Sequence, residues 1–144
     1  MIDVFDGEFA FLSNFYPSPI TENGITYPTV EHYFQAQKTL DINERHAIAA
    51  ADTPGRAKRM GRLVTLRPDW EKVKIDVMRR GLELKFQESF LRVRLIGTGS
   101  HELVEGNTWH DNTYGDCKCT RCKSIVGKNI LGKLLMDLRA KLVN

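Results

Sequence analysis

"YPTVEHYFQAQKTL", residues 27–40, combines good helix formers with an apolar side. An α-helix turns by about 100° per residue, so Glu31, Gln35 and Lys38 fall on one face. Phe34 borders this strip, and apolar surroundings favour the protonated form of a carboxyl, which suits an acid catalyst. The strip therefore indicates a site, although a solvated face of a surface helix gives the same periodicity.

Helical patterns dominate after this point. Thr29 is a good N-cap, and its helix is expected to run to about Leu40. A second helix over residues 54–61 starts at a proline, which the first turn tolerates, and stops near Gly61. The other helices are expected over residues 43–51, over residues 70–86 with Val73, Val77 and Leu84 toward the core, over residues 88–99, and after residue 128 with a buried stripe of Leu131, Leu134, Leu135, Leu138 and Leu142.

The only β signal lies near the N-terminus, where Asn23-Gly24 separates two short β-prone runs and predicts a hairpin. Residues 99–128 form a mostly polar run rich in helix breakers, and so long a loop indicates function. The predicted fold is mainly α: a single compact helical domain, residues 1–144, with a small N-terminal β-hairpin.

Composition supports a folded chain of ordinary type. Hydrophobic residues make up 42% and charged residues 27%, and the net charge of +3 is compatible with a phosphate-bearing ligand. The start lacks the basic and apolar runs of a secretory signal, and no apolar segment approaches the roughly 18 residues of a membrane span. We therefore expect a cytoplasmic protein without a membrane partner.

The three cysteines, Cys117, Cys119 and Cys122, lie within the stretch CKCTRC. An odd number in so short a stretch is a poor disulfide framework and suits a reducing compartment. They are able to wrap one zinc ion with His110 or His101 as a fourth ligand, but structural zinc usually draws paired ligands from two separated places. The sequence favours reduced, unliganded cysteines and no required metal or cofactor.

Several motifs together resemble one family. The chain carries, in order, FLSNFYPSPI, YPTVEHYFQAQK, AKRMGR, LRPDWEKVKIDVM, KF, LIGTG, LVEGNTWHDNTYGD and GKNILGKLLMDLR. In order and spacing these resemble the NADAR family, whose members include bacterial riboflavin-intermediate N-glycosidases and ADP-ribosyl-guanosine hydrolases. The resemblance covers nearly the whole chain and implies a small, mostly helical hydrolase that cleaves an N-glycosidic bond between a ribose phosphate and a nitrogen base.

The resemblance also implies roles for single residues. Glu31 resembles the family's catalytic glutamate, Trp70 the tryptophan of its DW motif, and Asp111 the aspartate before an aromatic-Gly pair. That pair is Tyr114-Gly115 here, where the family more often has Trp-Gly, which affects the stacking partner or the pocket width. The cysteine-bearing stretch is similar to only part of the family.

Cleavage of a ribose C1–N bond builds oxocarbenium-like charge on the sugar while the leaving nitrogen takes up a proton. We expect Glu31 to handle the proton and Asp111 to orient water or stabilise the sugar cation, although an aspartate in such a loop often only caps a turn. Lys38 is expected to act with them, either by neutralising phosphate or by trapping the opened sugar as an imine.

The remaining candidates are expected to bind substrate. Trp70 would stack on the base, although a tryptophan at a helix start is commonly a core anchor. Arg59 or Arg62 would reach the phosphates, with Gly61 allowing close backbone approach, unless this is a solvated helix face. Asn129 would cap the last helix or present its N-terminus to an anion. The other predicted substrate-binding residues are Asn14, Phe15, Tyr33, Gln35 and Tyr114.

The leading function is removal of ADP-ribose from modified guanine, in a nucleotide or a nucleic acid. The alternatives are an N-glycosidase acting on phosphorylated riboflavin intermediates, a non-catalytic module that binds ADP-ribose or a nucleotide, and a small zinc-bearing nucleic-acid adaptor. Retention of both Glu31 and Asp111 favours catalysis, because a binding module needs no acid at the sugar.

Overall fold

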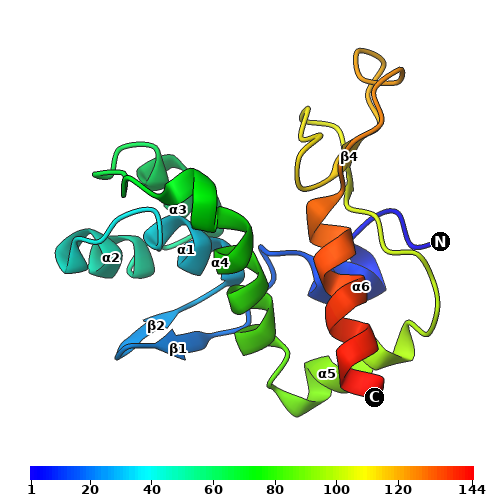
Figure 1. Ribbon diagram of the computed structural model, residues 1–144, viewed down its shortest axis with the longest axis horizontal. Coiled ribbons are helices and arrows are strands. Elements are labelled where there is room, and N and C mark those ends of the chain that lie inside the picture. The colour runs from blue at the N-terminus through cyan, green and yellow to red at the C-terminus, as the bar shows by residue number, and fades with distance from the viewer. The chain divides into compact units, whose positions relative to one another are not determined.

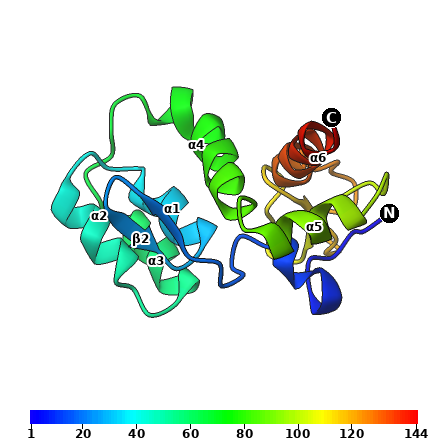
Figure 2. The same cartoon turned by 90° about the horizontal axis from the view of Figure 1, so that it is seen from below.

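The computed structural model describes residues 1–144, which fall into two units: residues 14–87, and residues 1–13 together with 88–144. Helices are the main regular secondary structure of each unit (Figure 1, Figure 2). The predicted mainly helical fold with a small N-terminal hairpin is confirmed. The prediction that residues 1–144 form one domain stays a prediction, and each unit is described by itself.

The unit of residues 14–87 begins with the predicted hairpin. Strands β1 (Ile20–Glu22) and β2 (Ile25–Tyr27) pair antiparallel, with Ile20 opposite Tyr27. Between them Asn23 and Gly24 have φ of +52° and +79°, the positive values that a type I′ turn requires at both central positions. The hairpin therefore follows from the local sequence.

Four helices complete this unit, and the central one is α1 (Val30–Ala36), which packs against the other three. All seven residues of α1 are buried. Thr29 caps it as predicted, since its side chain accepts a hydrogen bond from the His32 amide. The other helices are α2 (Ile42–Ala49), α3 (Pro54–Gly61) and α4 (Trp70–Lys85).

Helix α1 is shorter than predicted, because the chain leaves it at Ala36. The carbonyl of Lys38 accepts a hydrogen bond from the Arg67 amide at 2.8 Å, and the Thr39 hydroxyl donates to Glu44 at 2.8 Å. These bonds hold residues 38 and 39 outside the helix. The predicted bounds of α3 are confirmed.

The core face of α4 differs from the predicted one. Val73, Val77 and Leu84 are only half-buried. Gly81 lets Tyr33 and Val30 of α1 approach within 3.1 and 3.2 Å of the place where a Cβ would stand. This close approach sets the face of α4 that is buried, namely that of Trp70, Met78, Gly81, Leu82 and Lys85.

The second unit joins the N-terminal segment to the C-terminal half of the chain. The amide of Ile2 donates to Glu102 O and its carbonyl accepts from Val104 N, both at 2.8 Å. The Arg94 guanidinium lies 4.1 Å from the centroid of the Phe11 ring and donates to the carbonyl of Glu8. The elements of this unit are the 3₁₀ helix η1 (Gly7–Leu12), α5 (Ser89–Gly97), β3 (Gly106–Asn107), β4 (Asp116–Cys117) and α6 (Ile130–Val143).

Of the leucine stripe predicted for the last helix, Leu131, Leu134 and Leu135 are buried in α6, while Leu138 and Leu142 are half-buried. Within the predicted long loop, strands β3 and β4 pair in parallel. The amide of Asp116 donates a hydrogen bond to Glu105 O, and the amide of Lys118 donates one to Asn107 O. None of the helices has the length and apolar character needed to cross a membrane.

Candidate active site

Glu31 lies in the first turn of α1 and is only 9% exposed. Its Oε2 accepts a hydrogen bond from Gln35 Nε2 at 2.6 Å, the short distance typical of a bond to a charged acceptor. Its backbone amide donates to the carbonyl of Asn14 at 3.1 Å. Gln35 therefore holds the carboxylate that the sequence predicts as catalytic, and the carbonyl of Asn14 holds the backbone of the same residue.

Two buried amide oxygens accompany this carboxylate. Gln35 Oε1 and Asn14 Oδ1 are both buried and accept no hydrogen bond from the protein. Asn14 is fixed from its other side, because its Nδ2 donates to the sulfur of Met78 at 3.1 Å. Since a buried acceptor without a donor costs free energy, these two oxygens are suited to receive N–H or O–H groups of a ligand.

Lys38 follows α1 and is half-buried. Its pKa is lowered by burial; the negative charge of Glu31 opposes this shift, and the positive charges of Arg62 and Lys58 add to it. Glu31, Lys38, Arg62 and Lys58 thus form one group of interacting charges. One carboxylate among three cations suits a ligand that carries phosphate.

The same charges distinguish the two arginines that the sequence left as alternatives. Both arginines are exposed, but Arg62 is among the charges that shift the pKa of Lys38 and Arg59 is not. Lys58 belongs to the group without having been predicted as a site residue. It lies in the basic run of residues 56–62, and the density of that run is a signal from which it could have been found.

At Gly61, the last residue of α3, the space that a side chain would fill is occupied by Gln35. A Cβ built on Gly61 would come within 2.9 Å of Gln35 Cδ and closer still to Oε1. The prediction that Gly61 allows a phosphate to approach its backbone is wrong, because the side-chain amide of Gln35 fills that space. Gly61 instead allows the amide to reach Glu31.

Gly61→Ala is expected to lower kcat by about 10-fold or more, because the new methyl group displaces the Gln35 amide and breaks its bond to a charged partner, worth roughly 1.5–3 kcal/mol. Steady-state kinetics with a phosphorylated ribosyl substrate, with circular dichroism to verify folding, would measure this. Gly55→Ala in the same helix is the matched control, since its nearest neighbour would be Thr53 Oγ1 at 4.0 Å. Equal kcat values for the two variants would contradict the role given to Gln35.

The aromatic candidates of α1 and α4 are packed. Trp70 is 6% exposed, and its ring meets that of Phe34 edge-on, with centroids 5.1 Å apart. Tyr33 is 2% exposed and its hydroxyl donates to Glu22 at 2.8 Å. Both rings support α1 from within the core. Base stacking by Trp70 and substrate binding by Tyr33 stay predictions, as does the role of Phe15, which is exposed.

Asp111, in the other unit, is in the turn-capping arrangement that was the alternative to catalysis. Its Oδ1 accepts hydrogen bonds from the amides of Thr113 at 3.0 Å and Tyr114 at 2.9 Å. The side chain of Asn107 binds its backbone on both sides, donating to Asp111 O at 2.8 Å and accepting from Asp111 N at 3.2 Å. The catalytic role of Asp111 stays a prediction.

Asn129 stands at the N-cap of α6 with φ of +50°, but its side chain makes no cap bond. Instead Oδ1 accepts from the Glu105 amide at 3.0 Å and Nδ2 donates to the Leu103 carbonyl at 2.9 Å. Asn129 is 7% exposed. Its amide therefore ties the start of α6 to residues 103–105, and substrate binding by Asn129 stays a prediction.

The sequence model of the NADAR domain matches residues 4–143. The chain belongs to the NADAR family. It is 46% identical over 138 residues to N-glycosidase YbiA of Shigella flexneri serotype 5b, across 94% of this chain and 82% of YbiA. The NMR structure of YbiA from Escherichia coli matches with a TM-score of 0.81 and 42% identity, covering 99% of this chain and 87% of the other.

A more distant relative is the riboflavin biosynthesis protein VVA0006 of Vibrio vulnificus, 36% identical over 140 residues. The match covers 95% of this chain but 36% of that protein. The predicted family and the predicted enzyme class, an N-glycosidase that hydrolyses N-glycosyl bonds, are confirmed by these comparisons. Removal of ADP-ribose from guanine stays a prediction.

This NADAR protein also contains a buried lysine for which the sequence predicted no role. Lys85 is 1% exposed, with Nζ 5.7 Å from the centroid of the Tyr16 ring and 5.2 Å from that of Phe86. Burial lowers its pKa to about 7. The KF motif at residues 85–86 was the signal that marked this position.

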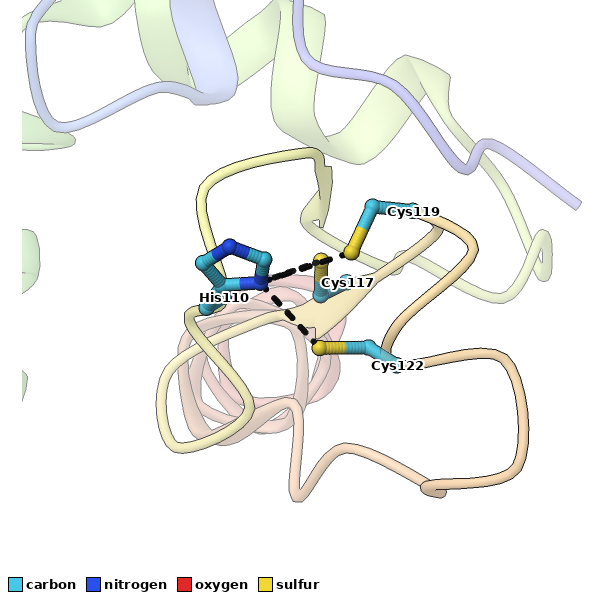
Figure 3. A group of neighbouring side chains, drawn as sticks. All are labelled: His110, Cys117, Cys119 and Cys122. Carbon is cyan, nitrogen blue, oxygen red and sulfur yellow. Dashed lines mark hydrogen bonds between the residues drawn. The ribbon is translucent and has the colours of Figure 1, made fainter.

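The cysteines of this NADAR protein gather around one histidine. The ligand atoms of His110, Cys117, Cys119 and Cys122 all lie within 4.8 Å of one another (Figure 3). His101, the other histidine considered as a ligand, is not in this group. Three thiols and an imidazole nitrogen at such distances are able to hold a metal ion.

Proposed function

We propose that this NADAR protein hydrolyses the C1–N bond between a phosphorylated ribose and a small nitrogen base, and that its substrate is a phosphorylated intermediate of the riboflavin pathway. The observation that carries the proposal is the buried Glu31 carboxylate, fixed by Gln35 beside the half-buried Lys38. The names of YbiA, an N-glycosidase, and VVA0006, a riboflavin biosynthesis protein, support the bond type and the pathway.

In the proposed reaction the electron pair of the C1–N bond leaves with the nitrogen, and the Glu31 carboxylate takes a proton from the attacking water. The sugar passes through an oxocarbenium-like state, and water adds its hydroxyl to C1. Glu31 then passes this proton to the leaving nitrogen and returns to the carboxylate form, so no other reactant is needed. Gln35 keeps the carboxyl group oriented through the 2.6 Å hydrogen bond.

The cations beside Glu31 are assigned to the phosphate. Arg62, at the C-cap of α3, and Lys58, in its last turn, both act electrostatically on Lys38, which follows α1. A phosphate bound among them would place the ribose near Glu31. The two buried amide oxygens, of Asn14 and Gln35, would accept hydrogen bonds from sugar hydroxyls or from amino groups of the base.

A second candidate substrate is ADP-ribosylated guanine. The observation that favours it is the number of cations, because three positive groups suit a diphosphate at least as well as a single phosphate. The bond to be broken is of the same type, and Glu31 would have the same role.

One assay separates these functions. The protein is incubated with the phosphorylated ribosylaminopyrimidine of the riboflavin pathway and, separately, with ADP-ribosylated guanosine, and products are followed by chromatography and mass spectrometry. Release of ribose phosphate from the first substrate is the expected result. Release of ADP-ribose from the second substrate alone would establish the second candidate. Binding without any product from either would indicate a non-catalytic module and overturn the proposal.

A further inference from the structure

We propose that His110, Cys117, Cys119 and Cys122 bind one zinc ion in a closed, structural site. The hydrogen-bond distances within the cluster fit this ion. His110 Nδ1 lies 3.3 Å from the sulfur of Cys122, 3.4 Å from that of Cys119 and 4.0 Å from that of Cys117. Zinc bonds of about 2.3 Å to sulfur and 2.0–2.1 Å to nitrogen, arranged tetrahedrally, place nitrogen and sulfur ligands about 3.6 Å apart.

The chemistry of the four ligands points to zinc among the metals. Three thiolates and one imidazole fill all four positions of a tetrahedral ion and leave none for water or substrate, as in structural Cys₃His sites. Soft sulfur ligands exclude magnesium and calcium, which prefer oxygen. Arg121 lies within the cysteine stretch and Lys123 directly follows it, and positive charges so close favour the excess negative charge of three thiolates on one divalent ion.

The backbone around the cluster holds the ligands together by bonds of its own. Cys117 lies in β4, and its amide donates to Asn112 Oδ1 at 2.9 Å. The amide of Cys122 donates to the carbonyl of Cys119 at 3.1 Å, which closes the turn between these two ligands. Cys117 and Cys122 are buried. Backbone hydrogen bonds of the loop therefore hold the three cysteines close together.

His110 provides an independent indication. Its φ of +68° lies in the left-handed region, where residues other than glycine are uncommon and which is often found at ligand sites. The residue is exposed, yet its Nδ1 is turned toward the three sulfurs (Figure 3). Binding through Nδ1 leaves the ring proton on Nε2.

The proposed zinc site would restrain the loop that contains the predicted catalytic residue Asp111, because His110 directly precedes Asp111. Asp111 caps the turn to Tyr114, and the amide of Leu131 in α6 donates to the Tyr114 carbonyl at 3.0 Å. A zinc ion joining residue 110 to residues 117–122 would fix both ends of the segment that contains Asp111 and Tyr114. This inference does not depend on the proposed substrate.

The test is metal analysis of protein purified without chelator and supplied with zinc during expression. Wild-type protein is expected to contain one zinc per chain, and Cys119→Ser and His110→Gln to lose most of it. His101→Gln is the matched control, since this exposed histidine lies outside the cluster, and it should retain zinc. Wild-type protein without stoichiometric zinc, or Cys119→Ser with a full complement, would overturn the proposal.

A second measurement on the wild-type protein keeps the test valid should the variants fail to fold. Under native conditions a thiol reagent is expected to modify the three cysteines slowly, and rapidly once a strong zinc chelator is added. Equal rates with and without chelator would mean that the thiols are reduced and unliganded, which is the alternative that the sequence favoured.

Discussion

Glu31→Gln is expected to lower kcat by about 10²–10⁴-fold, the usual contribution of a positioned general acid–base group, while substrate still binds. The substitution keeps the shape of the side chain, and its amide oxygen can still accept the hydrogen bond that Gln35 Nε2 now donates to the carboxylate at 2.6 Å. What is lost is the negative charge and the ability to take up and release a proton. Single-turnover kinetics with the riboflavin-pathway substrate, together with binding by calorimetry, would separate chemistry from affinity.

The fold is expected to tolerate this change. Glu31 lies at the positive end of α1, so the loss of its charge should change the free energy of unfolding by no more than about 1 kcal/mol. Glu71→Gln is the matched control, because Glu71 is an exposed carboxylate in the first turn of α4. Turnover of Glu31→Gln close to that of the Glu71→Gln variant would remove Glu31 from the mechanism and leave the proposed function without its proton-transfer group.

Features that depend on neighbours in the sequence were predicted well. The Asn23-Gly24 turn, the Thr29 cap and the limits of α3 are all local, because each depends on the conformations open to one or two residues. The strip of Glu31 and Gln35 follows from helical periodicity in the same way, and the hydrogen bond between them is a four-residue contact.

Features set by distant residues were missed. Helix α1 ends early because Arg67, far along the chain, binds the carbonyl of Lys38. The buried face of α4 depends on the fit of Gly81 against α1, and apolar residues on more than one face of α4 leave its pattern ambiguous. The space at Gly61 was assigned to a phosphate because no sequence pattern reveals that Gln35 occupies it.

The loop of residues 99–128 shows the same division. Its length indicated function, and the Asp111 turn was foreseen as an alternative. The choice between His101 and His110 beside the cysteines was not available from spacing, because it depends on the left-handed backbone at residue 110. For Asn129, position at the helix start was predicted correctly, but the partners of its side chain lie more than twenty residues earlier.

Asn129→Ala is expected to destabilise the protein by roughly 2–5 kcal/mol, because it leaves the buried Leu103 carbonyl and Glu105 amide without their partner, each at about 1–3 kcal/mol. Alanine also tolerates the left-handed conformation at φ +50° less well than asparagine does. Urea unfolding followed by circular dichroism would give the midpoint and the slope. The effect on KM should be small in protein that is still folded.

Asn129→Gly separates the two causes, since glycine accepts positive φ freely but makes neither side-chain bond. It should recover about 1 kcal/mol relative to alanine, the order of the left-handed penalty, and remain well below wild type. Asn43→Ala, at an exposed position of α2, serves as the control. If Asn129→Ala unfolded at the wild-type urea concentration and only raised KM, the side chain would belong to the substrate site, as the sequence predicted, and its two backbone bonds would contribute little to the fold.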